Sequence, residues 1–250
     1  MPARNPHALR EKMGLPENFN AIRQRIANAC ARAGRDAGSV MLLAVSKGMP
    51  PELIAEAAQL DQVYFGESKV QEAKAKIPLS PSRCRWHMIG HLQSNKCRDA
   101  IQLFEMIESV DSLALAQELN KWADKFSKRM PVLLEVNAAG EGTKFGLKPE
   151  QVVDACVAIN ELPRLEVHGL MTIAPWTPEP EKVRPVFRRL RELKQACEEK
   201  LGAPLPHLSM GMSGDFEIAI EEGSTIVRVG TALFGARPKS VRPASVDDTP

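Results

Sequence analysis

The sequence has 250 residues, of which 44% are hydrophobic and 26% are charged, and its formal net charge is +2. This length and apolar content suit one well-buried core, while a charge so near neutrality excludes proteins that hold nucleic acid or membrane surfaces through a strongly basic face. The five cysteines are widely spaced without a Cys-x-x-Cys pair, which argues against a disulfide framework or a thiolate zinc site and suits a reducing cytoplasm.

The N-terminal part of the chain predicts a helix and not a targeting signal. Residues 1–15 are polar and basic and lack the apolar core of a signal peptide. Apolar residues then recur at helical spacing between Phe19 and Ala33, which indicates an amphipathic helix. No run of about 18 apolar residues follows, so no membrane span is expected.

Strand and helix patterns alternate regularly through the first half of the chain. Short apolar runs predict strands over residues 42–47, 63–66, 85–90 and 106–110. Helical patterns follow over residues 51–60, 68–77 and 94–104, and a fourth helix is expected from a cap at Asp111 or Ser112 to Phe126. The first of these strands ends in an unusual way, because Lys47 occupies its last position, just before a glycine.

The second half of the chain repeats the alternation. Strands are expected over 131–137, 164–172, 207–210 and 225–230, with helices over 149–159, 186–197 and 215–222 and a short last helix from 231. Eight strand–helix units predict an α/β protein, a single (β/α)8 TIM barrel with an extra N-terminal helix. An open doubly wound sheet is the alternative. One domain is expected to span residues 1–235, followed by a disordered C-terminal tail over 236–250.

Lys47 is a candidate functional residue under either architecture, because both place chemistry at the C-terminal ends of the strands. An amine among apolar groups loses its proton more readily and becomes a nucleophile for carbonyl compounds. The alternative is a structural lysine whose stem lies along the core while its ammonium reaches water.

Two loops rich in glycine and hydroxyl residues follow the seventh and eighth predicted strands. Barrels commonly bind phosphate there, through backbone N–H groups, hydroxyl groups and a short helix N-terminus. The residues concerned are Ser209, Gly211, Ser213, Gly214, Gly230 and Thr231. Ordinary turns have a similar composition, and the second loop lacks the Lys-Ser/Thr pair that a nucleotide-triphosphate loop needs.

A lysine that forms an imine and faces a phosphate site suits two kinds of ligand, a sugar phosphate in an aldolase or pyridoxal 5'-phosphate (PLP). Arg228, just before the second loop, is placed to meet the ring nitrogen of PLP, which such a donor keeps unprotonated. A structural ion pair is the other interpretation of this arginine. His87 and His91 have no carboxylate at ligand spacing, so hydrogen bonding is favoured for them and no metal is expected.

Several stretches together are similar to those of one known family. They are AVSK at 44–47, FGES with VQE at 65–72, WHMIGHLQSNK at 86–96, KFGL at 144–147, GLMTIAP at 169–175 and LSMGMSGDFEIAIEEGSTIVRVGTALFG at 208–235. In combination they resemble the YggS/PROSC family of PLP homeostasis proteins. Its members share the fold of the N-terminal domain of alanine racemase, which is PLP fold type III.

The resemblance implies a set of cofactor-binding residues. Lys47 would be the Schiff-base lysine, and Arg228 would face the pyridine nitrogen. The residues implied to hold the phosphate are Ser209, Ser213, Gly230 and Thr231. Further neighbours of the cofactor are expected at Ser68, His87, Met210 and Gly211. Family members usually have Asn in place of Ser68, so the contact of that Asn is expected to differ here.

The implied function is intracellular PLP (vitamin B6) homeostasis, in which the protein stores or delivers PLP without a catalytic cycle and has no catalytic residues. Racemisation needs acid–base groups on both faces of the substrate carbon. In alanine racemases the second group is a tyrosine from a further domain, for which the chain after the eighth strand is expected to leave no room. A PLP-dependent amino-acid racemase of narrow scope, using Tyr64, His87 or water, is the alternative.

The expected partners follow from this function. They are PLP itself and apo PLP-dependent enzymes as recipients, with no nucleic acid and no membrane. A cytoplasmic monomer is predicted.

Overall fold

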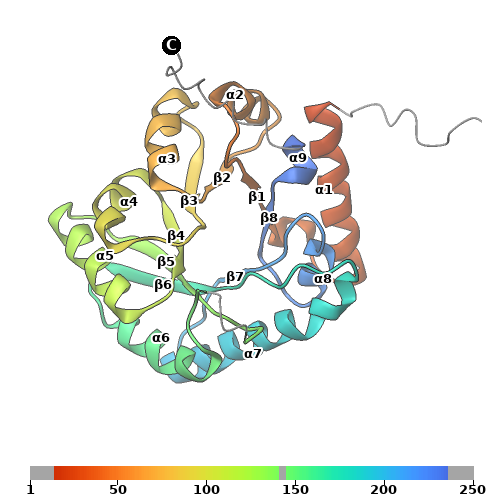
Figure 1. Ribbon diagram of the computed structural model, residues 1–250. Helices are drawn as coiled ribbons and strands as arrows, with labels where there is room; N and C mark the ends of the chain where they lie inside the picture. The colour runs from red at the N-terminus through yellow and green to blue at the C-terminus, as the bar shows by residue number, and fades with distance from the viewer. Residues whose placement is uncertain (1–13, 141–144, 236–250) are drawn as a thin grey trace, which may run out of the picture.

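The computed structural model describes residues 14–140 and 145–235, in which eight parallel strands close into a barrel in sequence order (Figure 1). The strands are β1 Met41–Val45, β2 Tyr64–Glu67, β3 Arg85–Met88, β4 Met106–Val110, β5 Met130–Glu135, β6 Leu165–Met171, β7 His207–Ser209 and β8 Ile226–Val229. Because β8 pairs back to β1, the predicted (β/α)8 barrel is confirmed and the open doubly wound sheet is wrong. The predicted tail over 236–250 lies outside the described residues.

Helices surround the barrel, one after each strand, and one more precedes the first strand (Figure 1). They are α1 Leu15–Arg32, α2 Pro51–Gln59, α3 Val70–Lys76, α4 Cys97–Leu103, α5 Leu113–Lys125, α6 Val152–Asn160, α7 Arg184–Leu201, α8 Phe216–Glu221 and α9 Thr231–Phe234. The cap of α5 is Ser112, whose hydroxyl oxygen accepts a hydrogen bond from Leu115 N at 3.3 Å. In the part of the chain that the structure describes, no helix is long and apolar enough to cross a membrane.

Two apolar cores hold this architecture together. The larger lies between the strands and the helices, and the smaller lies inside the barrel. The members of the inner core are Leu43, Val45, Ile89, Met106, Leu133, Met171 and Ile226. The strands are buried on both faces, which explains why they read as nearly continuous apolar runs in the sequence.

Five polar residues share the inside of the barrel with this inner core. Each one pairs in register with a member of the inner core on a neighbouring strand, or lies two residues from one on its own strand. They are His87, Glu108, Glu135, Ser209 and Arg228. Burial of so many polar groups is costly unless they bind one another or a ligand.

Helix α1 closes the gap between the first and last strand–helix units, where it packs against α8 and α9 (Figure 1). The rings of Phe19 and Phe234 meet edge to face with their centroids 6.0 Å apart. Asn18 Nδ2 donates a hydrogen bond to Leu233 O at 2.9 Å. The extra N-terminal helix predicted from the sequence therefore supports the two elements that follow the glycine-rich loops.

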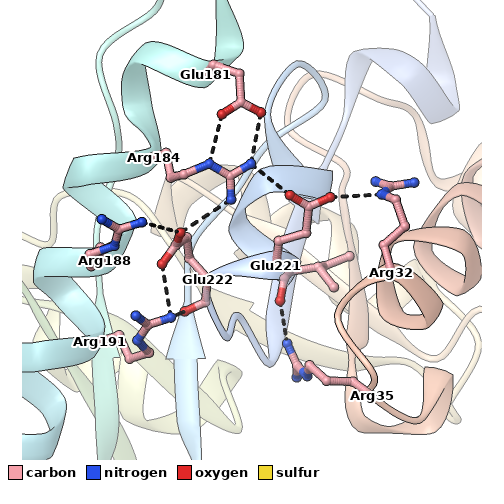
Figure 2. Close-up of polar contacts among 9 residues, drawn as sticks. Arg32, Arg35, Glu181, Arg184, Arg188, Arg191, Glu221 and Glu222 are labelled. Carbon is pink, nitrogen blue, oxygen red and sulfur yellow. Dashed lines mark hydrogen bonds and ion pairs between the residues drawn. The ribbon is translucent and has the colours of Figure 1, made fainter.

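A network of ion pairs fixes α8 between α7 and α1 (Figure 2). The Arg184 guanidinium contacts Glu221 Oε2 at 2.8 Å and Glu222 Oε1 at 3.3 Å, and Arg32 Nε contacts Glu221 Oε1 at 2.9 Å. On the α1 side, Arg35 also donates to Ile220 O at 2.7 Å. The side chains of this network range from buried, as in Glu222, to half-exposed, as in Arg32. Together these pairs orient the helix that follows the loop after β7.

Candidate functional site

A cavity of about 530 Å³ opens at the C-terminal end of the barrel. Seven residues that the sequence singled out line it, namely Lys47, Ser68, Ser213, Gly214, Arg228, Gly230 and Thr231. The fold therefore brings the lysine that follows the first strand together with both glycine-rich loops, although the two regions lie at opposite ends of the sequence.

Lys47 lies in a turn beyond β1. The strand ends at Val45, two residues earlier than predicted, and the Lys47 side chain is half-buried at the cavity wall. Met49 N donates to Ser46 O at 2.9 Å, which closes a four-residue turn with Lys47 and Gly48 at its centre. Gly48 has a φ of +75°, a conformation that glycine adopts at little cost at the third position of such a turn. The turn directs Lys47 from the barrel end into the cavity.

The two glycine-rich loops meet at the other side of the cavity. Ser213 Oγ accepts a hydrogen bond from Ala232 N at 3.4 Å, which joins the loop after β7 to the first turn of α9, directly after the loop that follows β8. A Cβ atom on Gly230 would lie 3.2 Å from Val45 O, so this loop packs tightly on the end of β1. Asp215 also lines the cavity, but its Oδ1 accepts a hydrogen bond from Met212 N at 2.6 Å.

Arg228 reaches the cavity from inside the barrel and is 4% exposed. Its Nη1 donates to Ser209 Oγ at 2.6 Å and its Nη2 to Thr172 O at 2.7 Å. Ser209 Oγ in turn donates to Glu108 Oε2, and His87 Nδ1 lies 2.7 Å from Glu108 Oε1. The guanidinium is therefore held in one orientation by a buried chain of hydrogen bonds.

The charged groups in this buried series of hydrogen bonds stabilise one another. Burial alone would raise the pKa of Glu108, but His87, Arg228 and Ser209 together lower it below its usual value. Burial lowers the pKa of Arg228, although nearby carboxyl groups, Glu108 first, oppose this. Because a guanidinium stays protonated in proteins, Arg228 and Glu108 form an ionic pair bridged by the Ser209 hydroxyl.

The structure places four of the predicted residues away from the cavity. Ser209 is fully buried in β7, and its hydroxyl group does not face the cavity but forms hydrogen bonds with Arg228 and Glu108. His87 belongs to the same buried series of hydrogen bonds through Glu108, and Met210 is fully buried. Gly211 has a φ of +95°, and a Cβ there would lie 2.6 Å from Ala219 Cβ, so this glycine serves packing beneath α8.

Several residues of the cavity were not predicted. The loop after β6 supplies Ile173, Trp176, Thr177 and Pro180, and Trp176 is 88% exposed at the cavity mouth. The only sign in the sequence was their position directly after a predicted strand, since barrels place their functional sites in the loops at the C-terminal ends of strands.

Glu135 at the end of β5 is a buried carboxyl group with incomplete hydrogen bonding. It is 7% exposed, and among the described residues its Oε2 has no hydrogen-bond partner. Burial, with a smaller contribution from Asp111, raises the pKa of Glu135 to about 7 against the opposing charge of Arg228. Glu135 is therefore partly protonated at neutral pH.

The variant Glu135→Gln is expected to gain stability over the wild type as pH rises. The unfolded chain releases this proton near the ordinary pKa of 4.5 and the folded chain near 7, so the wild type loses about 3 kcal/mol of unfolding free energy across that window. Glutamine does not ionise and avoids this loss. Urea unfolding at about pH 4, 6 and 8 measures the free energy of unfolding of both proteins. A difference in this free energy that stays constant with pH would contradict the raised pKa of Glu135.

Over residues 18–238 the sequence matches the family described as "Alanine racemase, N-terminal domain". A protein of Aquifex aeolicus named "Pyridoxal phosphate homeostasis protein" is 46% identical over 226 residues, which cover 90% of this chain and 99% of that protein. The chain belongs to the family of pyridoxal phosphate homeostasis proteins. The resemblance stated from the sequence motifs is thereby confirmed.

Solved structures agree with membership of this family. PipY of Synechococcus elongatus PCC7942, with PLP bound, is 34% identical to this chain with a TM-score of 0.77, and the match covers 89% of this chain and all of that one. The same protein without PLP gives a TM-score of 0.80. An alanine racemase of Clostridium difficile matches with a TM-score of 0.71 at 16% identity, over 90% of this chain and 57% of the racemase, which shows a shared fold alone.

Proposed function

We propose that this protein binds PLP in the cavity at the C-terminal end of the barrel, is joined to it covalently through Lys47, and stores or delivers it in PLP homeostasis. The observation that carries the proposal is the meeting of three kinds of group in one cavity, the amine of Lys47, the hydroxyl-bearing loops and the Arg228 guanidinium. The name of the Aquifex aeolicus relative and the PLP bound to PipY support it.

The donor set fits the three polar features of PLP. Hydroxyl and backbone N–H groups of Ser213, Gly230 and Thr231 suit the phosphate, because they offer hydrogen-bond donors on two loops that are joined to each other. Arg228 suits the ring nitrogen, since it is a donor fixed in orientation. Apolar residues such as Val45 and Ile89 provide walls for a flat ring. Ser209 takes the role of orienting Arg228 and not of binding phosphate.

When bound, PLP would supply an aldehyde that can condense with a primary amine with loss of water, and Lys47 would provide that amine. The chain's own part is to present the Lys47 amine at the cavity wall and to retain the phosphate at the opposite side. Arg228 would keep the ring nitrogen unprotonated, because a guanidinium donates and never accepts a hydrogen bond. A ring in that state withdraws electrons weakly, which suits storage more than catalysis.

Racemase activity has little support in the arrangement of the acid–base groups. Tyr64, the only tyrosine in the sequence, is the first residue of β2 and lines a separate cavity together with His207 and Thr225, at the N-terminal end of the barrel. His87 is bound to Glu108 inside the barrel and does not line the Lys47 cavity. Neither Tyr64 nor His87 therefore lies beside Lys47.

Recipient enzymes, a monomeric state and a cytoplasmic location stay predictions. All five cysteines are free and buried, which suits a reducing compartment. Transfer of PLP from the loaded protein to an apo PLP-dependent enzyme would test delivery directly.

A peptide map tests the proposed function. The protein is mixed with PLP, reduced with borohydride, digested and analysed by mass spectrometry. One pyridoxyl group on the peptide that contains Lys47 is the expected result. Attachment to a different lysine, or none at all, would overturn the proposal.

Racemisation is measured on the same PLP-loaded protein with a set of amino acids. No sustained turnover is expected, because neither Tyr64 nor His87 lines the cavity beside Lys47 to serve the second face of the substrate carbon. Turnover that persists and disappears in Lys47→Ala would establish the enzyme interpretation in place of the carrier.

A further inference from the structure

A cluster of three charged side chains lies directly behind the turn that carries Lys47. The Lys76 side chain is 5% exposed, and its Nζ lies 2.5 Å from Glu67 Oε1 and 2.8 Å from Glu72 Oε1. Glu67 is fully buried at the end of β2, and Glu72 is half-buried in the first turn of α3. None of the three lines the Lys47 cavity. We call these residues the Lys76 cluster.

The Lys76 cluster holds the backbone on both sides of Lys47. On the N-terminal side, Lys76 Nζ donates to Ser46 O at 2.7 Å and Ser46 Oγ donates to Glu67 Oε1 at 2.7 Å. On the C-terminal side, Gly48 N donates to Glu72 Oε1 at 2.5 Å. A single ammonium group thus links the two residues that flank Lys47 through two carboxyl groups.

A buried ionic cluster is an unusual way to support a turn. Buried ion pairs are weak stabilisers compared with well-packed apolar residues, and Glu67 Oε2 has no hydrogen-bond partner in the described part of the chain. Burial raises the pKa of Glu67, whereas the pKa of Glu72 is lowered because hydrogen bonds from Lys76 and Gly48 outweigh its burial. The cluster therefore supplies directional bonds more than net stability.

We infer that Lys76, together with Glu67 and Glu72, is a positioning group that fixes the direction in which the Lys47 amine enters the cavity. Attack on an aldehyde requires the nitrogen at a defined distance and angle, and small misplacements slow such steps strongly. The turn itself contains Gly48, whose backbone is permissive, so its geometry depends on external bonds. This inference rests on the proposed function, because the reaction it controls is capture of PLP by Lys47.

The test compares Lys76→Met with Lys74→Met. Both lysines belong to α3, but Lys74 is exposed and pairs with Asp99 at 3.1 Å on the surface. Apoprotein is mixed with saturating PLP, and covalent attachment to Lys47 is followed by reduction at timed intervals. Lys76→Met is expected to capture PLP about tenfold to a hundredfold more slowly, while Lys74→Met keeps the wild-type rate.

A second measurement does not depend on PLP. Competitive acetylation of the apoprotein, read for each lysine by mass spectrometry, reports how reactive the Lys47 amine is relative to exposed lysines. Its relative reactivity is expected to change in Lys76→Met and to stay unchanged in Lys74→Met. If wild-type Lys47 never captures PLP, the proposed function fails, whereas the acetylation profile still decides the positioning role.

A folded Lys76→Met protein with the wild-type capture rate and acetylation profile would overturn the inference. Should this variant not fold, Glu72→Ala takes its place, because Glu72 is partly exposed and its removal takes one acceptor from Gly48 N. Loss of this hydrogen bond is expected to slow capture about threefold or more. An unchanged rate in folded Glu72→Ala would equally refute the positioning role.

Discussion

Lys47→Ala is expected to lose covalent attachment of PLP completely while it keeps the wild-type fold. The bonds that hold the turn run through Ser46 and Gly48 and through the Lys76 cluster, so they do not involve the replaced side chain. Among the described residues that line the cavity, Lys47 is the only lysine. Its removal therefore takes away the nucleophile and leaves the groups proposed to bind the phosphate and the ring nitrogen.

The measurement is the visible absorbance of protein mixed with PLP, together with the borohydride-reduced peptide map. Lys47→Arg should behave in the same way, because it keeps the positive charge but lacks a primary amine. Lys69→Ala removes an exposed lysine beside α3 and should retain full attachment. Equal visible absorbance in Lys47→Ala and the wild type would show that PLP reacts elsewhere.

The fold was largely predictable because its causes are local. Short apolar runs, each followed by a helical pattern, appear in the sequence in the same order as β1 to β8 in the barrel. Element ends were less certain, as Lys47 shows, because the end of β1 depends on pairing with β2 and on the turn that Gly48 permits. Closure of the sheet is a long-range property, and the count of units was its only sign in the sequence.

The residues that line the cavity were predictable in the loops and at Arg228, but the contacts between side chains inside the barrel were not. Ser209 and Ser213 look alike in sequence, but Ser209 is the last residue of β7 and points into the barrel, whereas Ser213 lies in the loop. Lys76 reads as one of several solvated lysines in a helical pattern, yet it bonds to Ser46, 30 residues away. Such contacts depend on register and on helix placement, which periodicity does not specify.

Arg228→Glu is expected to destabilise the protein severely. The guanidinium is buried and bridged to Glu108 by Ser209, and the Glu135 and Asp215 carboxyl groups also act on it. A carboxyl group in its place would leave Glu108 without its cation and add a second negative charge inside the barrel. Loss of one partner from a buried ion pair costs about 3–5 kcal/mol, which for a chain of this size lowers the thermal midpoint by about 6–20 °C.

The cause of this loss can be separated from general damage to the core. Arg228→Gln removes the cation without adding a charge, so it should be less destabilised than Arg228→Glu. In Arg228→Glu the introduced carboxyl group has a folded-state pKa raised by burial and by Glu108, so the variant should recover stability as pH falls from about 8 to about 5. Adding Glu108→Gln to Arg228→Glu should also restore part of the lost stability, because it removes the negative charge that faces the introduced carboxyl group. Thermal unfolding of the four proteins is measured at both pH values. If the loss of stability in Arg228→Glu changes neither with pH nor on addition of Glu108→Gln, Arg228 stabilises the protein by packing and not by charge.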